Sequence, residues 1–212
     1  MIVGVVDYGV GNVGSVMRAL EVLRVTPLLV NRATDMHAAD CLILPGVGNF
    51  ADCVRMLEAG QWITALKEEV VGYNKPLLGV CVGMQLLADS STEGAVNGEP
   101  VKGLGFVSGQ VKHLAAMGCQ FRVPHVGWNA VNSAQAQDHL FHEIPPETDF
   151  YFVHSYAFEA KNAADVIATT QHGITVTAAV RRGHVWGTQF HPEKSSKAGF
   201  KVLKNFIEGP SC

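Results

Sequence analysis

The stretch PLLGVCVGMQLL, residues 76–87, decides the fold, because an apolar run changes there into a helical pattern within one turn. Residues 76–80 have the unbroken apolar character of a buried strand, and the segment that starts at Val82 has the spacing of a helix. Between them, GVCVG (79–83) has the shape of a nucleophile elbow, in which small flanking residues let the chain turn sharply. The elbow is predicted to hold the side chain of Cys81 above a sheet, at the N-terminus of a helix.

Strand and helix patterns alternate in the same way from Met1 to Ala88. The apolar runs are IVGVV (2–6), PLLV (27–30), CLIL (41–44) and PLLGV (76–80), and the helical patterns lie near 13–24 and across 50–71. This βα repetition predicts a parallel sheet whose strand ends gather along one edge. Ligands of such sheets bind beyond the carboxyl ends of the strands, which is where Cys81 is expected.

The second half of the chain differs from the first in composition and pattern. Residues 89–103 are rich in Gly, Ser, Asn and Pro. Strand patterns follow at 149–158 and 173–190, the latter with a hairpin turn at 182–184, and an amphipathic helix is expected at about 197–208. We therefore expect one α/β domain over residues 1–212, a central, mostly parallel sheet flanked by helices with an added antiparallel part in the C-terminal half.

Composition argues against two classes of partner. The chain has 212 residues, of which 48% are hydrophobic, and its 16 Lys and Arg against 19 Asp and Glu give no basic field for nucleic acid. No apolar stretch approaches the roughly 20 residues of a membrane span, and the sequence enters a strand without a basic leader. We expect a cytoplasmic protein that binds neither nucleic acid nor a membrane.

The cysteines are odd in number and have no CxxC spacing, which favours reduced thiols over a disulfide framework or a zinc site. They are Cys41, Cys53, Cys81, Cys119 and Cys212. Most turn cysteines are structural. Cys81 differs because the backbone N–H groups and dipole of a following helix favour a thiolate.

A second motif, QFHPE at 189–193, supplies partners for a reactive thiol. Residues two apart in an extended chain project to the same side, and Pro192 keeps the preceding backbone extended, so His191 and Glu193 are expected to act together. A thiol nucleophile needs a base for its proton, and the base needs a third group that orients it. Cys81, His191 and Glu193 are therefore the predicted catalytic set.

A third motif, LPGVG at 44–48, follows the third predicted strand. Attack on a carboxamide creates an oxyanion, which backbone N–H groups of Gly46, Val47 and Gly48, together with that of Val82, are expected to meet. Removal of one such donor typically raises the barrier by about 3–4 kcal/mol.

Two other patterns are weaker. GVGNVG at 9–14 matches the dinucleotide-binding spacing, but no acidic residue ends the second strand, and that chemistry would leave the Cys, His and Glu set unexplained. His139 and His142 lack further ligands at sensible spacing for a metal. We expect no cofactor and no metal.

These motifs carry a family resemblance. GVCVGMQLL (79–87) with FHPE (190–193) resembles the class I glutamine amidotransferases. Within that class the chain is similar to the glutaminase subunits of imidazole glycerol phosphate synthase, of histidine biosynthesis. The similarity runs along the chain in VDYGVGNVGSV (6–16), LPGVGNF (44–50), PHVGWN (124–129), YFVHSY (151–156) and FHPEKSSKAG (190–199).

The resemblance implies that Cys81 attacks the carboxamide of L-glutamine, that a thioester forms, and that water releases glutamate. His191 would move the protons, Glu193 would orient it, and Gly48, Gln85 and the backbone around Ser155 and Tyr156 would hold the substrate. Ammonia would pass to a (β/α)₈ cyclase subunit in a heterodimer, which makes imidazole glycerol phosphate and AICAR. The resemblance also places four residues near the subunit interface, namely Asn12, Trp128, Tyr151 and Lys194.

Three other functions stay open at this point. The chain is also compatible with another class I amidotransferase, with a free-standing γ-glutamyl hydrolase that needs no cyclase, and with a catalytically silent regulatory subunit.

Overall fold

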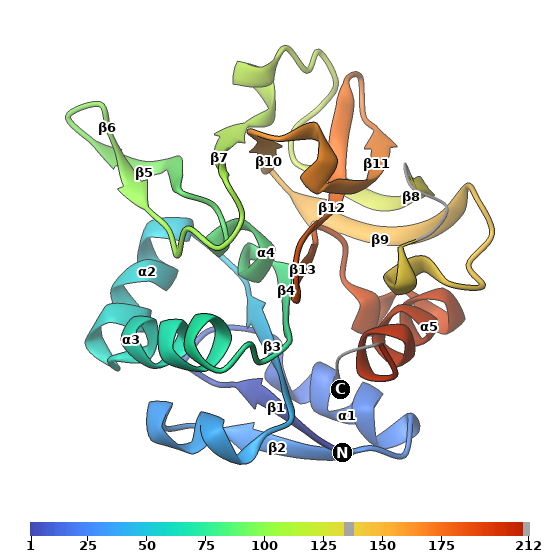
Figure 1. Cartoon of the computed structure of the whole chain (residues 1–212). Helices are drawn as coiled ribbons and strands as arrows, with labels where there is room; N and C mark the ends of the chain where they lie inside the picture. The colour runs from blue at the N-terminus through green and yellow to red at the C-terminus, as the bar shows by residue number, and fades with distance from the viewer. Residues whose placement is uncertain (134–137, 210–212) are drawn as a thin grey trace.

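A computed structural model describes residues 1–133 and 138–209. Their strands form two sheets (Figure 1). The large sheet has the order β2-β1-β3-β4-β13-β12-β11-β8-β9, and the small one has the order β10-β7-β5-β6. The strands of the large sheet are β1 (Ile2–Val6), β2 (Thr26–Val30), β3 (Cys41–Gly46), β4 (Leu77–Cys81), β8 (His125–Ser133), β9 (Thr148–His154), β11 (Val166–Gln171), β12 (Thr175–Arg182) and β13 (Val185–Thr188). Those of the small sheet are β5 (Ser90–Val96), β6 (Glu99–Lys102), β7 (Gly109–His113) and β10 (Tyr156–Ala160).

The parallel half of the large sheet positions the site. Strands β2, β1, β3, β4 and β13 run parallel, and β3, β4 and β13 are buried along their whole lengths. Their register sets Gly46 beside Cys81 and Thr188 beside Val80. The glycine loop, the elbow and the segment that carries His191 therefore leave the sheet at one edge, as the βα repetition predicts.

The other half of the large sheet is antiparallel. From β13 to β9 each neighbouring pair runs antiparallel, and the β12–β13 turn lies at the predicted hairpin. Ser155 separates β9 of the large sheet from β10 of the small one. The predicted α/β class, with a mixed sheet whose antiparallel part comes from the C-terminal half, is confirmed.

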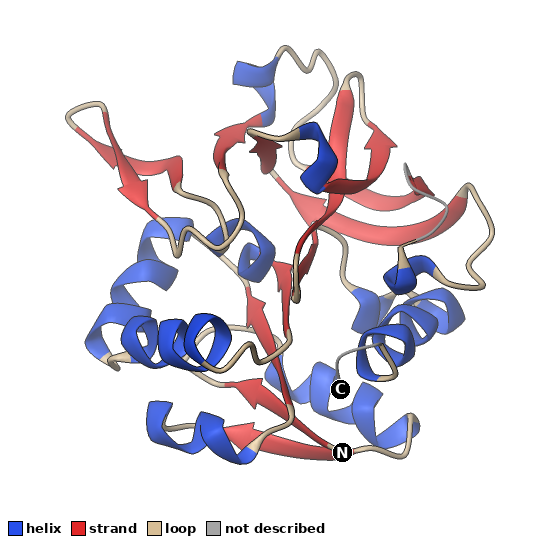
Figure 2. Ribbon diagram, in the orientation of Figure 1, coloured by secondary structure: helices blue, strands red, loops and turns tan. Residues whose placement is uncertain are grey.

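Helices cover both faces of the parallel strands (Figure 2), with α2 and α3 on one side and α1 and α5 on the other. The α-helices are α1 (Val13–Val22), α2 (Phe50–Ala59), α3 (Trp62–Leu66), α4 (Val82–Leu86) and α5 (Ser196–Ile207). The π-helix η2 (Lys67–Gly72) continues α3, and short 3₁₀ segments are η1 (Ala33–Ala38), η3 (Leu114–Met117), η4 (His139–Phe141), η5 (Ala163–Asp165) and η6 (Pro192–Lys194). Within residues 1–133 and 138–209, no helix has the length and apolarity needed to cross a membrane.

Two details differ from the sequence patterns. The segment 89–103, which showed only a polar change of texture, contains the hairpin β5–β6. Its turn is Asn97-Gly98, where both residues have positive φ (54° and 81°), as a tight hairpin turn requires. The third strand is also longer than CLIL and includes Pro45 and Gly46, because β4 offers a partner as far as Cys81.

Candidate active site

Cys81 stands on a strained turn between β4 and α4. Its φ of 56° and ψ of −112° lie outside the regions that a residue with a side chain ordinarily adopts. The turn is tight because its flanking glycines touch backbone: a Cβ on Gly79 would lie 2.5 Å from the carbonyl oxygen of Gly83. A Cβ on Gly83 would lie 1.8 Å from that of Leu44. This is the predicted elbow, and its side chain is 3% exposed.

Gly83→Ala is expected to lower the free energy of unfolding by roughly 3 kcal/mol, because the new methyl group has no space beside the Leu44 carbonyl. The measurement is a urea or guanidinium titration. Gly72→Ala is the matched control, because a Cβ there meets nothing within 4 Å, and it is expected to change stability by less than about 1 kcal/mol. Equal stability of the two variants would show that the elbow tolerates a side chain.

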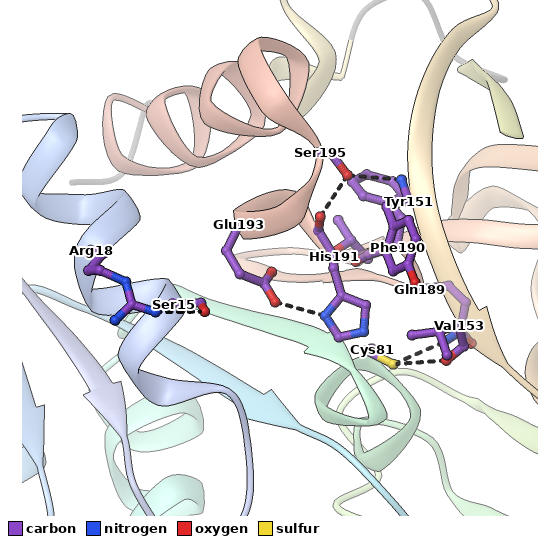
Figure 3. A network of polar contacts seen from close by, with 11 residues as sticks. Ser15, Arg18, Cys81, Tyr151, Val153, Gln189, Phe190, His191, Glu193 and Ser195 are labelled. Carbon is purple, nitrogen blue, oxygen red and sulfur yellow. Dashed lines mark hydrogen bonds and ion pairs between the residues drawn. The ribbon is translucent and has the colours of Figure 1, made fainter. Parts of the chain in front are cut away.

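His191 and Glu193 are joined directly. The Nδ1–H of His191 donates to Oε1 of Glu193 over 2.8 Å, and the side chains are only 2% and 1% exposed. Figure 3 shows the imidazole between the Glu193 carboxylate and the sulfur of Cys81. The second ring nitrogen, Nε2, has no hydrogen-bond partner of standard geometry within the described residues. One ring nitrogen is thus fixed by the carboxylate, and the other is left for the chemistry.

The segment that carries this pair is tied to β9. The backbone N–H of His191 donates to the carbonyl of Tyr151 over 3.0 Å, and the hydroxyl of Ser195 donates to the carbonyl of His191 over 2.6 Å while it accepts from the N–H of Tyr151. A Cβ on Gly199 would lie 1.9 Å from the carbonyl oxygen of Pro192, so α5 packs closely on the same segment. The position of the imidazole is therefore fixed by the hydrogen bonds of the His191 backbone as well as by Glu193.

The environment of His191 favours its protonated form. Burial lowers the pKa of the ring, but the neighbouring Cys81 and Glu193 both raise it, and the pKa is raised overall to about 9. An imidazolium held next to a sulfur stabilises a thiolate. The arrangement suits a thiol that passes its proton to His191.

A cavity of about 350 Å³ opens at Cys81 and brings most of the predicted site residues together. Its wall contains Val47, Gly48, Cys81, Val82, Gln85, Ser155, Tyr156, His191 and, from the predicted interface set, Lys194. Gly46 lies beside Cys81 in the sheet but is not part of the wall, and Glu193 stands behind His191. The loop after β3 thus reaches the cavity through Val47 and Gly48, and Gly48 has the positive φ (88°) of a glycine position.

Four further residues line the cavity that the sequence patterns did not indicate: Glu93, Pro124, Val153 and His154. Glu93 lies on β5, and its carboxylate accepts the N–H of Phe50 at the start of α2 over 2.8 Å. Burial raises the pKa of Glu93, and the Phe50 N–H opposes that rise. The polar composition of residues 89–103 did not indicate that Glu93 belongs to the site, because the position of Glu93 there depends on the β5–β6 hairpin.

Gln85 and His154 fix the wall on which Ser155 and Tyr156 lie. The carbonyl of Tyr156 accepts from Nε2 of Gln85 and from Nδ1 of His154, each over 2.9 Å. The carbonyl of Ser155 accepts the N–H of Leu114 over 2.9 Å. The predicted substrate wall is therefore a well-anchored backbone turn.

The other predicted interface residues lie outside the cavity. Trp128 and Tyr151 pair across β8 and β9 with ring centroids 6.1 Å apart, and Nζ of Lys194 lies 6.0 Å from the centroid of the Tyr151 ring. Trp128 is 53% exposed. Asn12 is the N-cap residue of α1, and α1 packs against η6.

A larger hollow, of about 930 Å³, lies at the opposite end of the strands, near Asp40 and Pro76. Its buried charges are already paired, because Nζ of Lys75 contacts Glu69 at 2.6 Å and donates to the carbonyl of Met36 at 2.7 Å. The predicted catalytic residues Cys81 and His191 line the smaller cavity and not this hollow.

The buried cysteines Cys41, Cys53, Cys81 and Cys119 form no disulfide within the described residues, and Cys212 lies outside them.

Comparisons with known proteins show the family of the chain. The family "Glutamine amidotransferase class-I" matches residues 4–209. Imidazole glycerol phosphate synthase subunit HisH of Moorella thermoacetica is 42% identical over 206 residues, covering 97% of this chain and 94% of that protein. The HisH subunit of Brucella abortus (strain 2308) is 39% identical over 218 residues, covering 98% and 99%.

Solved structures show the same fold at lower sequence identity. A crystal structure of a glutamine amidotransferase superposes with a TM-score of 0.75 at 20% identity and covers 98% of each chain. The structure of PurLQS from Thermotoga maritima gives a TM-score of 0.72 at 16% identity and covers 97% of each chain.

The elbow cysteine and the fold thus define a class I glutamine amidotransferase, which confirms the enzyme class predicted from the motifs. Within this class, the chain belongs to the family of HisH subunits of imidazole glycerol phosphate synthase.

Proposed function

We propose that this chain hydrolyses L-glutamine to glutamate and ammonia through Cys81, His191 and Glu193. The observation that carries the proposal is the buried His191–Glu193 contact of 2.8 Å, with Nε2 of His191 left unpartnered in the described residues on the side of the strained Cys81. This order of groups is that of a nucleophile, its base and the residue that orients the base.

The proposed reaction has two halves. The S–H proton of Cys81 moves to Nε2 of His191, and the sulfur attacks the carboxamide carbon of glutamine. The resulting oxyanion lies near the backbone N–H of Val82 and the loop of Val47 and Gly48. His191 returns the proton to the amide nitrogen, the C–N bond breaks, and ammonia leaves a thioester. Water then gives a proton to His191, adds to the thioester and releases glutamate, which restores the thiol.

The cavity supports glutamine as the substrate. Its volume of about 350 Å³ is at the small end of ligand sites, which suits a single amino acid. The half-buried carboxylate of Glu93 gives the wall a negative group for an α-ammonium, and the positive Lys194 lies on the same wall. The same wall also contains neutral polar groups, from Gln85, Ser155 and Tyr156.

The proposal extends to a cyclase partner, to which the ammonia passes for synthesis of imidazole glycerol phosphate and AICAR, and to a cytoplasmic heterodimer. An exposed apolar surface beside the cavity supports a docking partner. Val126, Trp128 and Val153 are 56%, 53% and 38% exposed on paired strands β8 and β9. Val153 also lines the cavity, so a partner on this surface lies against the site where ammonia forms.

A glutaminase assay with and without the cyclase subunit and its ligand tests the whole proposal. Activity is expected to be weak for the chain alone, to rise with the loaded partner, and to vanish in Cys81→Ser under both conditions. Ammonia release that the partner leaves unchanged would contradict the partner assignment. Full activity of Cys81→Ser would contradict the mechanism itself.

A further inference from the structure

Gln189 is a buried amide beside the nucleophile that the reaction above does not use. It follows β13 directly, has no exposed surface, and is anchored by its backbone N–H, which donates to the carbonyl of Ala178 over 2.8 Å. Its Nε2 lies 3.9 Å from Sγ of Cys81, and its Oε1 lies 3.0 Å from Nε2 of Gln85. Figure 3 shows the Gln189 amide directed at the sulfur.

The orientation of this amide follows from one backbone carbonyl. The carbonyl of Tyr156 accepts and cannot donate, so the group of Gln85 that faces it at 2.9 Å must be the NH₂. The same NH₂ donates its second proton to Gln189, so the atom of Gln189 that accepts this hydrogen bond is its amide oxygen. With the oxygen of Gln189 fixed on that side, its N–H groups point to Cys81. The reverse orientation would set two NH₂ groups against each other.

A neutral histidine completes the partners of the Tyr156 carbonyl. Nδ1–H of His154 donates to that carbonyl, so its Nε2 is the acceptor for Nδ1–H of His125 over 3.0 Å. Burial lowers the pKa of His154 to about 3 and that of His125 to about 4, which keeps both rings neutral at physiological pH. The carbonyl accepts two donors in fixed directions, which locks the amide of Gln85 and, through it, the amide of Gln189.

The sulfur of Cys81 faces two groups with opposite preferences. The carbonyl of Val153, 4.0 Å from Sγ, accepts a hydrogen bond and therefore favours the thiol. The N–H of Gln189 donates and therefore favours the thiolate.

We propose that Gln189 is a further catalytic residue, whose side-chain N–H stabilises the thiolate of Cys81. In the step concerned, the S–H bond of Cys81 breaks, its proton moves to Nε2 of His191, and the negative charge left on sulfur receives the Gln189 N–H. Gln85 and the Tyr156 carbonyl act as positioning groups for this donor. The inference rests on the proposed role of Cys81 as the nucleophile.

The test is the pH dependence of alkylation of Cys81 by iodoacetamide, followed by mass spectrometry of the Cys81 peptide in the full chain. Gln189→Leu removes the donor, and the midpoint of the rate is expected to move to higher pH by roughly one unit, as for loss of one hydrogen bond to a charged group. Gln189→Met, which keeps the length of the side chain, is expected to give the same shift. It decides the outcome if circular dichroism shows that Gln189→Leu is unfolded.

Thr188→Val is the matched control, because it removes a buried hydrogen bond of 3.1 Å to the carbonyl of Phe190 at the same strand end. Its alkylation midpoint is expected to equal that of the unchanged protein. Midpoints for the folded Gln189 variants that equal the control would overturn the proposal. Alkylation needs no glutamine, so this outcome is separate from failure of the proposed function, which the Cys81→Ser glutaminase assay reports.

Discussion

His191→Ala is expected to lower kcat for glutamine by about 10⁴-fold to 10⁶-fold, the loss found when one member of a nucleophile–base unit is removed. Without the imidazole, the buried thiol of Cys81 has no proton acceptor, and the amide nitrogen has no acid to convert it into ammonia. The substrate wall of Gln85 and Tyr156 does not touch His191 through a hydrogen bond of the described residues, so KM is expected to change by less than about threefold.

The double variant Cys81→Ala/His191→Ala is expected to be no slower than either single variant, because the two groups act in one step. The measurement is initial-rate release of glutamate with the cyclase partner present. His142→Ala is the control, since that histidine side chain is 63% exposed and stands apart from the cavity. If the loss of kcat in the double variant equalled the product of the two single losses, the two residues would act independently.

The elbow was predictable because its causes are local. The chain must turn sharply at Cys81, between Gly79 and Gly83. These two positions must be glycine because a Cβ at either one would collide with backbone. The pairing of His191 with Glu193 was predictable for the same reason, since Pro192 between them restricts the backbone. Parallel strand order then follows from βα repetition, and it brings both motifs to one edge.

The rest of the cavity depends on contacts between segments that are distant in sequence. Glu93 reaches the site because Asn97-Gly98 folds a hairpin that pairs with β7 and packs against α2. His154 lines the cavity because β9 pairs with β8 in a register that sets it opposite His125, and no local pattern in YFVHSY specifies that register. The Asn-Gly turn was a visible signal for the hairpin, but nothing in the sequence shows where a hairpin packs.

Glu193→Gln is expected to reduce kcat by about 10²-fold to 10⁴-fold, because the amide keeps the shape of the carboxylate and loses its charge. In the unchanged protein the carboxylate orients Nδ1–H of His191 over 2.8 Å and stabilises the imidazolium that forms as Cys81 is deprotonated. An amide accepts the same hydrogen bond with less stabilisation of the cation. Initial rates across pH 6 to 9 measure the effect, and a loss below about threefold would show that Glu193 is structural.

The same variant is expected to change how stability depends on pH. The pKa of His191 is raised from 6.5 to about 9 in the folded chain, so its protonation contributes stability that is fully present below 6.5 and is lost as pH rises through 9. With Gln at position 193, one of the two groups that raise this pKa is gone while burial still lowers it. The free energy of unfolding should therefore fall less between pH 6.5 and 9 than in the unchanged protein.

Urea titrations along this range measure the slope, and repeating them in a Cys81→Ser background removes the other group that raises the pKa of His191. Equal slopes with Glu and Gln in that background would show that the carboxylate does not hold the proton on His191.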